Sequence, residues 1–110
     1  MSEKTNYHFI TLDQLPMREL LENAFAGFLQ TERLTIGYTD LKAGVKIPMH
    51  SHPEEAIDIV LEGELEMQIG EERSILAKGI VTTVPSNVLH GARALTDCKV
   101  VTVFYPRRNL

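Results

Sequence analysis

The sequence predicts an all-β domain closed as an antiparallel barrel or jelly roll. From Glu32 onward, short runs rich in β-branched residues alternate with turns of Gly, Pro and polar residues, which is typical of all-β proteins. About eight such runs must close on themselves or stack as two sheets, because only then are their apolar faces buried and their edges protected. The 110 residues, 44% of them hydrophobic, suffice for one core, so we expect a single domain over residues 1–110.

The expected strands follow one another with short connections. The most regular run is 64–69, in which Leu65, Met67 and Ile69 alternate with polar residues, as in a strand with one face in water. The turn at 70–73 predicts a hairpin between this strand and the next. The other expected strands cover 33–41, 57–61, 74–77, 80–84, 88–95 and 99–105.

A short helix is expected near the N-terminus, over residues 13–23. Asp13 is a suitable N-cap, and Pro16 suits the first turn. An apolar side is supplied by Leu15, Leu20 and Leu21.

Composition excludes several classes of function. Fifteen acidic residues against eleven basic ones give a net charge of −4, and the basic residues form no patch, so we expect no nucleic-acid partner. No apolar run approaches the roughly 20 residues that cross a bilayer, and the first residues are polar, so neither membrane insertion nor export is expected. Cys98 is the single cysteine and forms no intrachain disulfide, which fits a reducing cytoplasm.

Three of the four histidines form a candidate metal site. His50 and His52 alternate across Ser51, so in an extended segment both imidazoles project from the same face. His90 lies in an apolar stretch, where an imidazole needs a hydrogen-bond partner or a metal. Neutral imidazole binds divalent Zn, Fe, Mn or Ni, and the pattern does not distinguish among these metals.

The residues around these histidines resemble the two motifs of the cupin superfamily. The first motif, a glycine followed by His-x-His and a closing glycine, is matched by 44–52 and 57–63. The second, a glycine, a proline, an inner glycine and a histidine, is matched by 79–90. Asn87 replaces the inner glycine, and Asn is the non-glycine residue that best tolerates a left-handed turn. The resemblance covers about 33–105.

The resemblance implies a double-stranded β-helix, the jelly-roll barrel of cupins, with one divalent metal ion held by His50, His52 and His90. The usual fourth ligand falls at Ala56, which binds nothing. Glu54 and Asp58 share the strand parity of Ala56. Residues i and i+2 lie roughly 6.5 Å apart along a strand, so Asp58 is expected to act through a water or as a general base. If no carboxylate binds, the site is a three-histidine face like that of some iron-dependent cupin dioxygenases.

A second resemblance lies at the C-terminus. The run 101–108 is similar to the tail of small cupins that linearise unsaturated uronates released from pectin and alginate. In those enzymes the last strand supplies an aspartate, a phenylalanine and an arginine to the pocket. Phe104 and Arg108 match two of them, and Thr102 stands in place of the aspartate.

These observations favour a metal-dependent enzyme acting on a small, polar, oxygen-rich substrate such as a sugar acid or an enol. Asp58 is the candidate for proton transfer, with Glu54 as the alternative, and Arg108 for pairing with a substrate carboxylate. The expected substrate pocket contains Glu54, Ala56, Thr102 and Phe104. Two alternatives remain, an Fe(II) dioxygenase and a binding or sensing cupin without turnover. Since cupins commonly form homodimers, we expect one here, with a strand over 7–12 adding to a neighbour's sheet edge.

Overall fold

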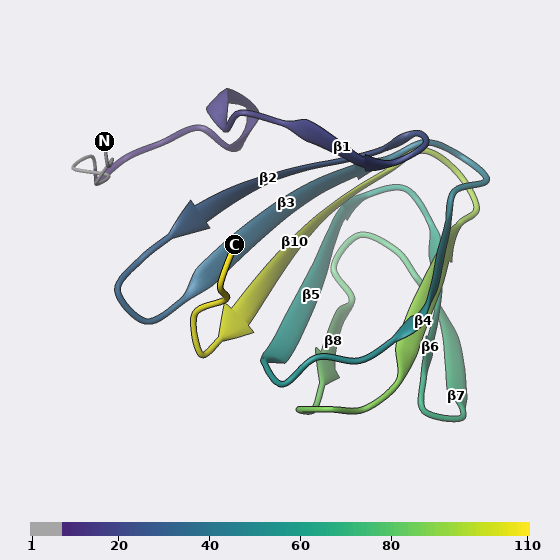
Figure 1. The fold of residues 1–110 in the computed structure, drawn as a ribbon. Coiled ribbons are helices and arrows are strands. Elements are labelled where there is room, and N and C mark those ends of the chain that lie inside the picture. Colours follow the sequence, from purple (N-terminus) through teal and green to yellow (C-terminus); the bar gives the residue numbers. More distant parts are fainter. Residues whose placement is uncertain (1–7) are drawn as a thin grey trace.

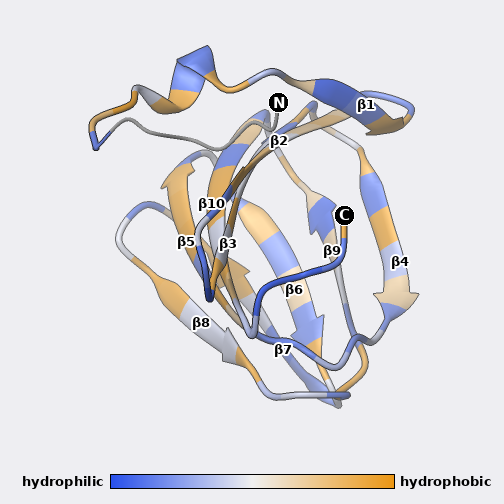
Figure 2. Cartoon of the chain, turned by 60° about the vertical axis from the view of Figure 1, so that its left-hand side comes forward, coloured by the Kyte–Doolittle hydropathy of each residue, from blue (hydrophilic) through white to orange (hydrophobic). Residues whose placement is uncertain are grey.

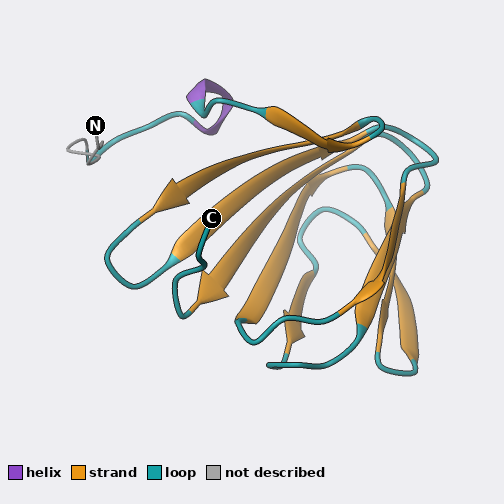
Figure 3. Ribbon diagram, viewed as in Figure 1, coloured by secondary structure: helices purple, strands orange, loops and turns teal. Residues whose placement is uncertain are grey.

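The computed structural model describes residues 8–110, which form ten strands and one 3-10 turn (Figures 1 and 3). No helix of these residues is long and apolar enough to cross a membrane. The elements are η1 Leu12–Gln14, β1 Arg18–Leu21, β2 Ala24–Gln30, β3 Thr35–Leu41, β4 Lys46–His50, β5 Glu55–Glu62, β6 Leu65–Ile69, β7 Glu72–Leu76, β8 Val81–Val84, β9 His90–Ala94 and β10 Cys98–Tyr105.

The strands form two antiparallel sheets that face each other across one core. The larger sheet has the order β1-β2-β3-β10-β5-β8, and the smaller has the order β4-β9-β6-β7 (Figure 1). Apolar and polar residues alternate along several strands, which Figure 2 shows as blue and orange bands on β6. Inward-facing side chains such as Val60, Leu76 and Val84 are almost completely buried. The predicted antiparallel double-sheet barrel is therefore confirmed.

Strand alternation in the larger sheet decides which side chains enter the barrel. Along β5, Ala56, Asp58 and Val60 are buried, whereas the residues between them are more exposed. Antiparallel pairing places Thr102 of β10 and Thr82 of β8 directly opposite Asp58, one on each side. The sheet thus carries three polar side chains in one row of its inner face.

The expected helix over 13–23 is wrong. The chain makes only the short turn η1 and then enters a hairpin of β1 and β2. Pro16 restricts the preceding Leu15, which is extended at φ −67° and ψ 133°, and this ends the turn. Asp13 makes no capping bond and instead accepts a hydrogen bond from the hydroxyl of Tyr38, at 2.9 Å. Asn23, at φ 66°, turns the chain from β1 into β2.

The N-terminal part differs from the sequence analysis in two further respects. Strand β2 was not predicted, because Ala24–Gln30 carries apolar residues on both of its faces and so lacks the alternation of a half-exposed strand. Conversely, His8–Thr11 is not a strand and Leu12 lies in η1. Tyr7, the first residue of the expected strand 7–12, lies outside the described residues.

Candidate metal centre

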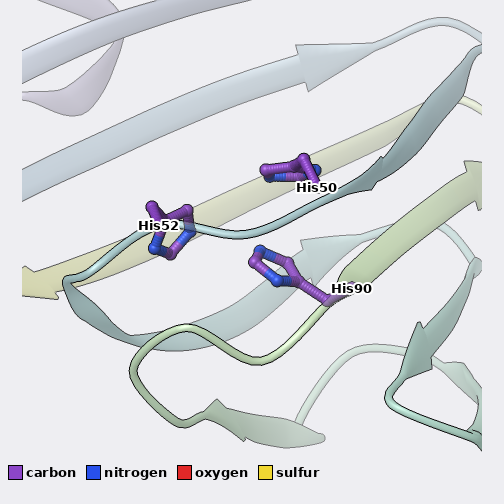
Figure 4. Close-up of side chains that lie close together, drawn as sticks. All are labelled: His50, His52 and His90. Atoms are coloured by element: carbon purple, nitrogen blue, oxygen red, sulfur yellow. The ribbon is translucent and has the colours of Figure 1, made fainter.

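Three imidazoles from two neighbouring strands and one loop converge at the mouth of the barrel. His50 ends β4, His52 follows in the next loop, and His90 begins β9, where it pairs with His50. The ring centroid of His90 lies 4.3 Å from that of His50 and 4.7 Å from that of His52. One nitrogen of each ring lies within 4.8 Å of one nitrogen of each other ring. Figure 4 shows the three rings turned toward one another.

The same backbone contact fixes the tautomer of every ring. Nδ1 of each histidine lies 2.9 Å from a backbone carbonyl oxygen two residues away, in Pro48 for His50, Glu54 for His52 and Val88 for His90. A carbonyl only accepts hydrogen bonds, so each Nδ1 carries the proton and each Nε2 keeps its lone pair. This is the outer contact that orients histidine ligands in metal sites. The donor set therefore fits a divalent ion held by three nitrogens.

The two loops that carry the histidines are bonded to each other. Asn87 donates its backbone N–H to the carbonyl of His52 at 2.8 Å, and Ser86 donates its hydroxyl to the carbonyl of Pro53 at 2.6 Å. Asn87 has φ 65°, the left-handed conformation expected where it replaces the motif glycine. These contacts fix the loop after His52 against the loop before His90.

Burial keeps His90 in the form that binds metal. It lowers the pKa of His90, and the nearby rings of His50 and His52 lower this pKa further. The bond to the Val88 carbonyl and the charge of Asp58 act in the opposite direction, but the pKa remains below its ordinary value. A neutral imidazole is the form with a lone pair to offer.

Asp58 is a buried carboxylate in the same cavity. The residue is 8% exposed, and its Oδ1 accepts a hydrogen bond from the Thr102 hydroxyl at 2.6 Å. Its Oδ2 accepts a longer bond of 3.3 Å from Thr82. Thr102 of β10 is the partner of Asp58 across the strand pair. A carboxylate carried by β5 therefore lies at this level of the barrel, bonded to a hydroxyl of β10.

The cavity has a volume of about 190 Å³ and unites most of the sequence-predicted residues. Its lining is shared by the three histidines and by residues of both sheets and the C-terminal segment, among them Ala56, Asp58, Thr102, Phe104 and Arg108.

Arg108 lies at the rim of this cavity, over an aromatic ring. Its Cζ is 4.7 Å from the ring centroid of Phe104, and that ring meets the His52 ring edge to face at 5.6 Å. A guanidinium at this distance from an aromatic face is attracted to it. Phe104 thus connects the arginine with the histidine cluster.

Glu54 is near the site but does not line the cavity. Its Oε1 lies 3.6 Å from Nε of Arg108 and 3.7 Å from Nδ1 of His52, and it accepts no hydrogen bond from any described residue. The carboxylate of Glu54 therefore lies within ion-pair distance of Arg108 and His52, the two side chains that do line the cavity. Glu55, the other acid of this segment, is exposed.

Sequence reasoning missed three residues that hold the site together. Thr82 bonds to Asp58, while Gln30 and Thr35 bond to the backbone of Arg108. Their types and local patterns are those of ordinary strand residues, so the sequence carried no signal for these contacts.

Comparison with known proteins agrees with this geometry. The family model described as a cupin domain matches residues 37–104. The chain belongs to the cupin family. Among curated proteins, it is 29% identical over 97 residues to an uncharacterised protein of Streptomyces coelicolor, which covers 86% of this chain and 92% of that protein. It is 40% identical over 55 residues to the H2HPP isomerase of Bacillus subtilis, which amounts to 49% of this chain and 23% of the isomerase.

Solved cupin structures superpose on nearly the whole chain. An RmlC-like cupin from Shewanella frigidimarina has a TM-score of 0.86 at 23% identity, covering 94% of each chain. KdgF from a Halomonas species has a TM-score of 0.85 at 25% identity, covering 91% of this chain and 95% of KdgF. An oxalate decarboxylase from Bacillus subtilis has a TM-score of 0.78 at 19% identity, covering 88% of this chain but 29% of that one. The barrel is therefore a cupin barrel.

Proposed function

We propose that this cupin is a metal-dependent enzyme acting on a small, oxygen-rich carboxylate, such as a sugar acid or an enol acid. The observation that carries the proposal is the content of one cavity: the three histidines, the buried carboxylate of Asp58 and the guanidinium of Arg108. The C-terminal resemblance to cupins that linearise unsaturated uronates supports this substrate class.

The three histidines would hold one divalent ion, of Zn, Fe, Mn or Ni, through their Nε2 atoms. When bound, such an ion supplies a Lewis acid for substrate oxygens. Asp58 would accept the proton that the substrate loses, since its carboxylate lies inside the cavity and two threonine hydroxyls hold it in place. Arg108 would pair with the substrate carboxylate, because a planar guanidinium offers two parallel N–H donors.

Metal analysis and two substitutions test the proposal. Protein purified without added metal should contain about one divalent ion per chain, and His90→Ala should lose it. The metal-loaded protein should convert unsaturated uronates or related enol acids. Asp58→Asn keeps the acceptor for Thr102, so it should retain the fold and the metal yet lose most turnover, about 100-fold or more. Full activity of Asp58→Asn would remove the acid–base role.

A second candidate function is Fe(II)-dependent dioxygenation, and the ligand set favours it. The cluster of potential ligands among the described residues contains three histidines and no carboxylate. Oxygen consumption restored by Fe²⁺ alone, with an enolisable or aromatic substrate, would select this function. Tight ligand binding without any product would instead indicate a binding or sensing protein.

We also propose that the protein forms a homodimer through the outer face of the larger sheet. The side chains that face outward there from β5, β8 and β10 are mostly apolar, and Ile57, Val81 and Tyr105 are 38%, 55% and 54% exposed. A face of this kind fits a flat apolar partner, and a second copy offers the same face in an isologous contact. Light scattering should give twice the chain mass, and Ile57→Lys should give a folded monomer. A monomeric wild type would refute this proposal.

A further inference from the structure

The last residues of the chain cross the end of the β2–β3 hairpin outside any strand. Residues 106–110 follow β10 and take no part in a sheet ladder. Arg107 donates a guanidinium N–H to the carbonyl of Thr31 at 2.9 Å. Arg108 is the next residue, and its side chain turns back over Phe104 into the rim of the cavity. Its position therefore depends on side-chain bonds, because no ladder holds it.

Gln30 and Thr35 supply those bonds. Thr35 accepts the backbone N–H of Arg108 at 2.9 Å, and Gln30 donates its side-chain amide to the Arg108 carbonyl at 3.0 Å. The Thr35 hydroxyl in turn donates to the side-chain oxygen of Gln30, which closes a ring of three hydrogen bonds. Gln30 and Thr35 are opposite each other in the β2–β3 pair, and Thr35 is completely buried.

The direction of every bond in this ring is determined. The Thr35 hydroxyl donates its one proton to Gln30 and accepts the backbone N–H of Arg108 with a lone pair. The side-chain oxygen of Gln30 accepts from Thr35, and its amino group donates to the Arg108 carbonyl. These bonds are partly buried, so a group of the ring that lost its partner would lose a hydrogen bond that water replaces only in part. The ring therefore holds the backbone of Arg108 in one place.

A second pair of contacts holds the guanidinium itself. The Phe104 ring lies beneath it, and the buried Oε1 of Glu54 stands 3.6 Å from its Nε. The side chain of Arg108 is 32% exposed, so its remaining N–H donors can reach a ligand entering from solvent. An arginine fixed in this way loses little conformational freedom when it binds a carboxylate.

We infer that Gln30 and Thr35 are positioning residues, which fix Arg108 at the cavity rim so that it recognises a carboxylate group. This inference rests on the proposed function, and it adds the two residues on which carboxylate selectivity depends. Neither residue lines the cavity. Both therefore act on it through their bonds to the backbone of Arg108.

NMR of arginine side chains tests the inference in the metal-free protein. In the wild type, the Nε–H group of Arg108 should be nearly as ordered as the backbone, whereas that of exposed Arg73 should be mobile. Acetate should shift the Arg108 signal with a millimolar dissociation constant, and neutral acetamide should not. The signal is assigned by its loss in Arg108→Lys.

Thr35→Val keeps the shape of the side chain and removes both of its hydrogen bonds. In this variant we expect a mobile Arg108 side chain and an acetate affinity about 5–10-fold weaker than in the wild type. This factor corresponds to the net free energy of roughly one hydrogen bond. Gln30→Met should act in the same direction. Thr35→Ser restores the hydroxyl and should return both readouts to within about twofold of the wild type.

Two results would overturn the inference. One is a Thr35→Val protein, folded by its amide spectrum, in which Arg108 stays ordered and binds acetate normally. The other is an ordered wild-type Arg108 that does not respond to acetate, because the positioning would then serve no carboxylate. If both NMR results are as expected and the metal-loaded protein shows no turnover, only the proposed enzymatic function fails.

Discussion

Ala56→Glu returns a ligand to the position where the cupin motif usually carries one. Ala56 is 2% exposed and lines the cavity beside the three histidines. Its neighbours across the strands are Phe104 and Val84, so the longer side chain has room only toward the cavity. The new carboxylate should therefore approach a bound metal ion.

The size of the effect of Ala56→Glu on stability should depend on metal. Without metal, the substitution places extra atoms and a charge in a buried site, which costs about 1–3 kcal/mol. With metal, a carboxylate ligand should tighten binding by roughly 10–100-fold, and each factor of ten adds about 1.4 kcal/mol of stabilisation at saturating metal. The metal-induced gain in unfolding free energy should thus be about 1.4–2.8 kcal/mol larger in Ala56→Glu than in the wild type.

Thermal unfolding with chelator and with saturating Zn²⁺ or Ni²⁺ measures this difference, and calorimetric titration gives the metal affinity. Ala94→Glu is the matched control, because Ala94 is 1% exposed but does not line the cavity. The Ala94→Glu protein should lose about the same unfolding free energy, relative to the wild type, with metal as without it. An equal metal-induced gain in Ala56→Glu and the wild type would refute the assignment of Ala56 as the missing ligand position.

Three further predictions concern single side chains. His90→Ala should lose at least about 100-fold in metal affinity by titration while its metal-free form still unfolds cooperatively, and unchanged affinity would contradict the three-histidine site. Burial raises the pKa of the Cys98 thiol, so Ellman's reagent should react with it only on unfolding; rapid reaction of the native protein would disagree. Burial and the bond to Asp13 also raise the pKa of Tyr38, so its hydroxyl stays protonated to a higher pH in the native state than in the unfolded chain. The free energy of unfolding should therefore keep the contribution of this hydroxyl below about pH 10 and lose it as the pH rises further. Tyr38→Phe should lessen this loss, as measured by denaturant titrations at several pH values.

Local sequence patterns predicted the barrel and the faces of its strands. Alternation in β5 places Ala56 and Asp58 on one face because side chains in a strand have a period of two, whatever the neighbouring strands are. The motif spacing likewise identified the three histidines that the fold brings together. The same local reasoning failed over 13–23, where leucines suggested a helix and the chain instead forms a hairpin with β2.

Only the tertiary structure decided which side chains meet across strands. The register between β10 and β5 brings Thr102 to Asp58, although 44 positions separate them in the chain. The ring of Gln30, Thr35 and Arg108 likewise joins residues 73 and 78 positions apart. A strand's own sequence determines which face each side chain takes, since that depends on the local pleat. Its neighbours depend on strand order and register, which the burial of all the strands together determines.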